Sequence, residues 1–219
     1  TYTYIIASGE GREALIIDPV IEHSDEYSTI LKNLDLKLVK VIDTHIHADH
    51  ISALNELNKR TNCIRVMGEK SKSEVIDLRI KDGEKINVEE VELQAIYTPG
   101  HTDCSYSFLM NDRVFTGDTL LINGSGRTDF QNGNAYDAYD SIFNKLLKLP
   151  EKTFVFPAHD YNGKKFSTIE NEKNNNPRLQ VSSKEEYADI MNNLNLANPK
   201  MMDVAVPANV KGLTLDNIN

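Results

Sequence analysis

The sequence contains no tryptophan and only two cysteines, Cys63 and Cys104, among its 219 residues. Two thiols without a CxxC pair make a poor disulfide framework for a chain of this length, so we expect a reducing, cytoplasmic compartment. No apolar run approaches the roughly 18 residues that a membrane-spanning helix needs, so we expect no membrane partner. The chain begins at Thr1 without an initiator methionine or an apolar signal core, which leaves room for targeting residues ahead of it.

Positive charge is also scarce, because 24 lysines and arginines face 33 aspartates and glutamates and give a formal net charge of −9. Nucleic acid binding normally needs a basic face, so this balance argues against nucleic acid as a partner. An acidic protein can still bind a small anion through a local cationic pocket. With 40% hydrophobic and 26% charged residues, the composition is that of a soluble globular protein.

No internal repeat, low-complexity tract or long linker divides the chain, so we expect one domain over residues 1–219. Short apolar strands alternate with amphipathic helices, which predicts an α/β fold. The expected strands are residues 3–7, 13–17, 38–43, 64–67, 85–88, 91–97, 105–110, 113–116 and 153–156. The expected helices run from a cap at Ser24 to about Asp35, from Ile51 to Arg60, from a cap at Asn134 to Leu149, and from Ser183 through Asn193 as the final helix. The polar run 170–176 is expected to be a solvated helix end and loop.

Five of the six histidines fall into three short strings, THIHADH at 44–50, PGHT at 99–102 and PAHD at 157–160. The candidate metal ligands are His45, His47, Asp49, His50, His101, Asp118 and His159. Crowding three imidazoles and a carboxylate on one loop without a ligand would cost desolvation and repulsion, so the first string predicts metal binding. The sixth histidine, His23, has no companion ligand, and we expect it to be solvated.

Each candidate ligand group lies where an expected strand ends and a loop begins. If those strands are neighbours, their ends converge on one edge of the sheet, where a rigid scaffold can hold several imidazoles around an ion. His45 and His47, two residues apart, can point the same way from an extended segment, whereas Asp49 and His50 project differently. One loop could therefore serve two ions.

With these residues in order, the chain resembles the metallo-β-lactamase superfamily, whose signature is an HxHxDH loop followed by a histidine, a bridging aspartate and a last histidine. The resemblance implies an αββα sandwich of two mixed sheets flanked by helices, with the site at one edge. In the two-metal pattern of that superfamily, the first ion would face His45, His47 and His101, the second would face Asp49, His50 and His159, and Asp118 would bridge them.

Further segments resemble persulfide dioxygenases of the ethylmalonic-encephalopathy-protein type. They are TPGHTD at 98–103, FTGDTLL at 115–121, GRTDFQ at 126–131, FPAHDYNG at 156–163, NPR at 176–178 and AVPAN at 205–209. The resemblance implies one Fe(II) ion per chain, bound by His45, His101 and Asp118, and oxidation of glutathione persulfide by O2 to glutathione and sulfite. Such a two-histidine, one-carboxylate set leaves coordination positions open.

The resemblance also implies a homodimer, a rhodanese-type sulfurtransferase as a possible supplier of persulfide, and the mitochondrial matrix if the source is eukaryotic. All seven side chains of the two-metal set are present, so ligand counting alone favours two ions. We interpret the other four, together with Asp160, as a hydrogen-bonding shell around one iron; the four are His47, Asp49, His50 and His159.

Glutathione carries two carboxylates, so an acidic protein must supply a cation near the site. Arg127, in a glycine-rich loop, is the candidate because its planar guanidinium can hold a carboxylate at two points. A structural ion pair between Arg127 and Asp129 is an equally weighted alternative. Tyr161 could donate a hydroxyl to the substrate. We expect Cys104 to be a buried apolar thiol and not a catalytic one.

Two other functions stay open at this point. A glyoxalase II-like thioester hydrolase acting on S-acyl glutathione would use two metals and need no oxygen, although only 60 residues follow His159, fewer than its usual helical domain needs. A non-catalytic metal- or thiol-binding module would have a closed coordination sphere and no turnover.

Overall fold

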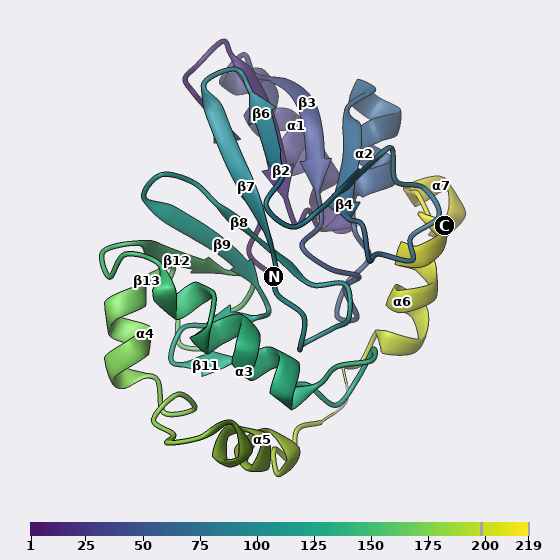
Figure 1. The fold of residues 1–219 in the computed structure, drawn as a ribbon. Coiled ribbons are helices and arrows are strands. Elements are labelled where there is room, and N and C mark those ends of the chain that lie inside the picture. The colour runs from purple at the N-terminus through teal and green to yellow at the C-terminus, as the bar shows by residue number, and fades with distance from the viewer. Residues whose placement is uncertain (198, 219) are drawn as a thin grey trace.

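The computed structural model describes residues 1–197 and 199–218, and they form four layers in the order helices, sheet, sheet, helices (Figure 1). This confirms the predicted αββα sandwich. The two sheets face each other across a core of side chains from both, among them Leu15 and Ile42 from the first sheet and Leu93 and Phe108 from the second. No helix among the described residues is long and apolar enough to cross a membrane.

The first sheet carries the start of the chain. Its strands are β1 (Tyr4–Ala7), β2 (Glu13–Ile17), β3 (Lys37–Ile42), β4 (Ile64–Gly68) and β5 (Leu78–Ile80), and they lie side by side in that order. β1 and β2 are antiparallel, whereas β2 to β5 are parallel. The buried β2 and β3 therefore end at the same edge, and the residues after each strand meet there.

The second sheet has the order β13-β12-β9-β8-β7-β6. Its strands are β6 (Lys85–Val88), β7 (Val91–Tyr97), β8 (Tyr106–Leu109), β9 (Arg113–Gly117), β12 (Phe154–Pro157) and β13 (Ser167–Thr168), and a separate hairpin pairs β10 (Leu120–Leu121) with β11 (Gly124–Ser125). β9 and β12 are parallel, and β7 runs in the same direction because two antiparallel pairings separate it from β9. The ends of β7, β9 and β12 thus share one edge.

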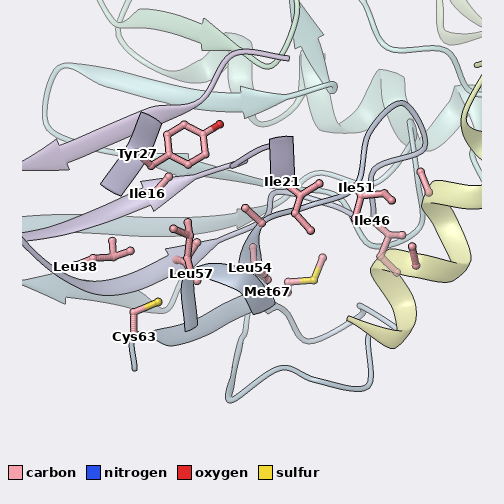
Figure 2. Close-up of a cluster of buried hydrophobic side chains, with 14 of the residues drawn as sticks. Ile16, Ile21, Tyr27, Leu38, Ile46, Ile51, Leu54, Leu57, Cys63 and Met67 are labelled. Atoms are coloured by element: carbon pink, nitrogen blue, oxygen red, sulfur yellow. The ribbon is translucent and has the colours of Figure 1, made fainter. Parts of the chain in front are cut away.

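Helices cover the outer face of each sheet. The first sheet is covered by η1 (Ile21–His23), α1 (Ser24–Asn33), α2 (Leu54–Thr61), α6 (Met202–Lys211) and α7 (Leu215–Ile218), and the second by α3 (Ala135–Phe143), η2 (Leu146–Lys148), α4 (Ile169–Asn175) and α5 (Lys184–Asn192). Figure 2 shows the core under the first group, where Ile46 and Ile51 from the histidine-bearing loop pack beside Leu54 of α2. The loop is therefore anchored by apolar burial as well as by its strand.

Most expected elements are present, and the N-cap roles of Asn134 and Ser183 are confirmed by side-chain acceptance of backbone N–H groups. Five expectations were wrong. Ser24 does not cap α1, because it is the first residue of that helix and its hydroxyl donates to the carbonyl of Ile21. The helix expected from Ile51 begins at Leu54. The helix after Asn134 ends at Phe143, with a separate 3-10 turn before Leu149. The run 170–176 lies mostly in α4, where Glu172 is fully buried. The helix after Ser183 is not the last, because α6 and α7 follow it.

Candidate metal centre

The histidine-bearing loop follows β3 and is fixed from both sheets. The backbone N–H of Thr44 donates to Oδ1 of Asp18, at the end of β2, over 2.7 Å. The carbonyl of Thr44 accepts from the N–H of Tyr106, in β8 of the second sheet, over 2.9 Å. Asn209 of α6 donates its amide to the carbonyls of His47 and His50, both over 2.9 Å. The loop is thus held at several backbone points, and its buried imidazoles are fixed in place.

The structure brings His45, His101 and Asp118 together, with one candidate ligand atom from each lying within 4.8 Å of the others. Nε2 of His101 lies 3.5 Å from Oδ2 of Asp118, and the rings of His45 and His101 are 4.9 Å apart at nearly a right angle. These three come from the ends of β3, β7 and β9, as the strand-end pattern predicts. This triad is the set that the family resemblance implies for iron.

A glycine permits the close approach of β9 to the loop after β3. Gly117 has a φ of +51°, and a Cβ at this position would lie 2.5 Å from the hydroxyl oxygen of Thr44. No side chain fits in that space without displacing Thr44. The turn that Gly117 allows leads directly into Asp118.

Hydrogen bonds orient both imidazoles of the triad. Nδ1 of His101 donates to the carbonyl of Arg127 over 2.8 Å, since a carbonyl can only accept. The Thr44 hydroxyl donates to Oδ2 of Asp18 over 3.0 Å and accepts from Nδ1 of His45 over 2.9 Å. In both rings the proton is therefore on Nδ1, and the lone pair of Nε2 is available for an ion.

The electrostatics of the triad suit a cation. Burial, helped by the neighbouring imidazoles, holds the pKa of His45 well below its ordinary value, so the ring is neutral and able to ligate. Burial alone would raise the pKa of Asp118, but His159, His101 and His45 outweigh it and lower that pKa. Oδ1 of Asp118 is buried without a hydrogen-bond partner among the described residues. A buried carboxylate oxygen with no partner, beside two oriented imidazoles, fits a metal ion.

The remaining candidate ligands make contacts of their own. Nε2 of His159 and Nδ1 of His50 each lie 3.2 Å from a carboxylate oxygen of Asp49. Nε2 of His47 lies 3.2 Å from Oδ1 of Asp18, and its Nδ1 is buried without a hydrogen-bond partner among the described residues. Asp160, expected in the same shell, is not brought into it.

The Asp160 carboxylate instead accepts the N–H groups of Asn162 and Lys164 in the following loop, over 2.9 and 2.6 Å. His23 lies on the surface beside Glu26, as expected. Cys104 is buried, and burial raises its pKa, which agrees with an apolar role.

A cavity of about 450 Å³ opens directly on the triad, within the size range of small-molecule sites. Its walls include His45, His101, Asp118, Leu121, Arg127, His159, Tyr161, Arg178 and Leu196. Tyr161 is largely exposed and stacks on His159 with ring centroids 5.9 Å apart, so its hydroxyl is free to meet a ligand. The cavity therefore joins the candidate ion site to an apolar wall with a few polar groups.

Two arginines line this cavity, and they differ in what they contact. Arg127 forms a two-point ion pair with Asp129 over 2.6 and 2.7 Å and donates to the carbonyl of Ala197 over 2.7 Å. Arg178 donates to the carbonyl of Ser125, and no carboxylate partner lies within 4.0 Å of it among the described residues. Arg127 thus has the structural ion pair that was the alternative to substrate contact, and Arg178 is the better placed free cation.

Several residues that shape the site could not be found by searching the sequence for clusters of histidines. Asp18 and Thr44 orient His45, Asn209 holds the loop, and Gln131 donates its amide to the carbonyl of Ile46 over 2.7 Å. Gln131, Arg178 and Asn209 do stand in the segments that carry the family resemblance. Those segments could have indicated their role, whereas Asp18 had no such signal.

Comparison with known proteins adds sequence and structural relatives. Residues 1–77 and 68–159 match the family model described as the metallo-beta-lactamase superfamily. The mitochondrial persulfide dioxygenase ETHE1 of Mus musculus is 43% identical over 214 residues, covering 96% of this chain and 84% of that protein. The crystal structure of ETHE1 from Myxococcus xanthus superposes with a TM-score of 0.93 at 47% identity, covering 96% of this chain and 93% of that one. A hydroxyacylglutathione hydrolase of Dictyostelium discoideum is 29% identical, covering 80% of this chain and 68% of that protein.

Proposed function

The chain belongs to the persulfide dioxygenase family of the metallo-β-lactamase superfamily, and we propose that it oxidises glutathione persulfide at one iron(II) ion held by His45, His101 and Asp118. In this reaction glutathione persulfide, dioxygen and water are converted to glutathione and sulfite. The observation that carries the proposal is the triad itself, whose three ligand atoms lie within 4.8 Å of one another at the floor of an open cavity.

We propose iron as the ion because two imidazoles and one carboxylate with an open face are the ligand set of non-haem iron oxygenases. When bound, the ion would supply coordination positions for the substrate sulfur and dioxygen and would polarise the latter. The chain contributes the orientation of the ligands. Thr44 and the carbonyl of Arg127 fix the two imidazoles, so neither ring must reorganise during the reaction.

We propose that Arg178 binds a carboxylate of the glutathione part of the substrate. Its guanidinium lines the cavity and has no acidic partner within residues 1–197 and 199–218, and burial lowers its pKa from the ordinary value because no carboxylate compensates its charge. Tyr161 lines the same cavity and can donate its hydroxyl to the peptide. Leu121 and Leu196 form the apolar part of the wall, which would keep water from the reacting sulfur.

From the family we further propose a homodimer that receives its persulfide from a rhodanese-type sulfurtransferase. The compartment would be the cytoplasm, or the mitochondrial matrix in a eukaryote, since the mouse relative is named as mitochondrial.

The test is an anaerobic purification followed by metal analysis and by oxygen uptake with glutathione persulfide. We expect one iron per chain, oxygen uptake and release of sulfite. His45→Ala should lose both iron and oxygen uptake, while His23→Ala, an exposed histidine on the surface, should keep both. Iron-replete protein that takes up no oxygen with the persulfide would contradict the proposal.

The glyoxalase II-like alternative is supported only by more distant relatives, such as the Dictyostelium hydrolase at 29% identity. It predicts hydrolysis of an S-acyl glutathione without oxygen. The same preparation, incubated with S-lactoyl glutathione under nitrogen, separates the two functions.

A further inference from the structure

The residues that would bind a second ion in this superfamily surround the hydroxyl of Thr1. Its Oγ1 lies 2.8 Å from Oδ2 of Asp49, 3.1 Å from Nδ1 of His50 and 3.4 Å from Nε2 of His159. Thr1 therefore lies among the side chains that the superfamily pattern assigns to a second ion, of which Asp49 and His50, together with His47, have ligand atoms within 4.8 Å of one another. The distances from the Thr1 hydroxyl are those of hydrogen bonds, whereas a metal needs ligands at about 2.0 to 2.2 Å.

We propose that Thr1 makes this centre mononuclear, because its hydroxyl occupies the second-ion position and hydrogen-bonds to the side chains that would otherwise ligate a metal. A second ion could bind only by displacing Thr1 and breaking these hydrogen bonds. The seven superfamily ligand types can thus all be present while one ion binds. The proposal rests on the one-ion centre proposed above.

The residues next to Thr1 fix it in this position. The N–H of Tyr2 donates to the carbonyl of Ala158 over 2.6 Å, and Ala158 directly precedes His159. The hydroxyl of Thr3 donates to the carbonyl of Asp18 over 2.8 Å, and that of Tyr4 donates to the carbonyl of Pro157 over 2.6 Å. The segment before β1 is therefore attached to the ends of β2 and β12, on both sides of the metal centre.

The three side chains around Thr1 also hold one another. Asp49 lies 3.2 Å from both His50 and His159, so its carboxylate joins the two imidazoles. Thr1 adds a fourth polar group at the open side, since the residue as a whole is exposed. Removing its hydroxyl would leave three metal-ligating groups facing a gap that solvent ions can reach.

The test compares the number of metal ions bound per chain. Wild type, Thr1→Ala, Thr1→Ser and Thr29→Ala are equilibrated with excess zinc(II) and desalted, and their transition-metal ions are counted by mass spectrometry. We expect one ion in wild type, in Thr1→Ser, which keeps the hydroxyl, and in Thr29→Ala, which removes an exposed hydroxyl on α1 away from the site. Thr1→Ala should bind two ions, the second at least about tenfold more tightly than wild type does.

A double variant locates the extra ion. Thr1→Ala combined with His50→Ala should return to one ion, because the second site then lacks a ligand. One ion in Thr1→Ala, or two in wild type, Thr1→Ser or Thr29→Ala, would overturn the proposal. Zinc counting needs no turnover, so it is independent of the dioxygenase assay. A wild type without oxygen uptake would overturn the proposed function and leave the role of Thr1 intact.

Discussion

The hydroxyl oxygen of Thr44 lies 2.9 Å from Nδ1 of His45, and the same hydroxyl donates a hydrogen bond to the carboxylate of Asp18 over 3.0 Å. Thr44→Val keeps the shape of the side chain and removes this link. We expect metal affinity to fall by about 10- to 100-fold, because the His45 ring loses its orienting partner. Competition with a chromogenic chelator measures the change.

The matched control is Thr29→Val, whose hydroxyl donates to the carbonyl of Asp25 on the exposed face of α1. This control should bind metal like wild type. Equal affinity in Thr44→Val and Thr29→Val would show that the link through Thr44 does not matter.

Arg178 and Arg127 should differ in their effect on substrate binding. A hydrogen bond to a charged group contributes about 1.5 to 3 kcal/mol, so Arg178→Ala should raise KM for glutathione persulfide about tenfold or more, with iron content unchanged. The KM of Arg178→Lys should lie between those of wild type and Arg178→Ala, since lysine keeps the positive charge but lacks the planar fork of the guanidinium. Arg127→Ala should change KM less, because both edges of its guanidinium already have partners. A larger effect at Arg127 than at Arg178 would reverse this assignment.

Asn209 should support both stability and metal binding. Asn209→Ala leaves the carbonyls of His47 and His50 and the N–H of Ser52 without their partner, and we expect a loss of about 1 to 3 kcal/mol in the free energy of unfolding. Urea unfolding measures it. Asn175→Ala, which removes only an exposed bond to Asn171, should change stability by less than about 0.5 kcal/mol.

The two thiols predict a loss of stability at alkaline pH. Burial raises the pKa of Cys63 and Cys104 above the ordinary value of 9.0, so both stay protonated in the folded state. As pH rises through 9.0, the unfolded thiols ionise first, and stability that is fully present below this pH is progressively lost. A Cys63→Ala and Cys104→Ala double variant should show a weaker fall in the free energy of unfolding above this pH. It should also keep its dioxygenase activity, and a loss of turnover with intact iron would contradict the apolar role of Cys104.

Local pattern accounts for much of this fold. The alternation and apolar runs that form β2, β6 and β7 are readable in the sequence, and side-chain chemistry gives Asn134 and Ser183 as caps. Because each candidate ligand follows a strand, the meeting of His45, His101 and Asp118 could also be anticipated. The layer order needed the family resemblance, since periodicity does not say which strands are neighbours.

Other features depend on contacts between distant residues. α4 reads as polar, yet Ile169 and Glu172 are buried against the second sheet, and α6 contains Pro207, which argues against a helix. Asp129 pairs with Arg127 in the structure, and nothing in the sequence separates that outcome from substrate contact. Thr1 lies 158 positions from His159, so no local pattern connects them.

Gly117 and Thr44 meet where the two sheets adjoin, since Gly117 ends β9 of the second sheet and Thr44 follows β3 of the first sheet. His45 comes from one half of the sandwich, and His101 and Asp118 come from the other. An ion bound by all three side chains would link the two sheets, and its binding free energy would add to the stability of the folded protein. Removing the ion should therefore lower the free energy of unfolding of the whole protein as well as abolish its activity.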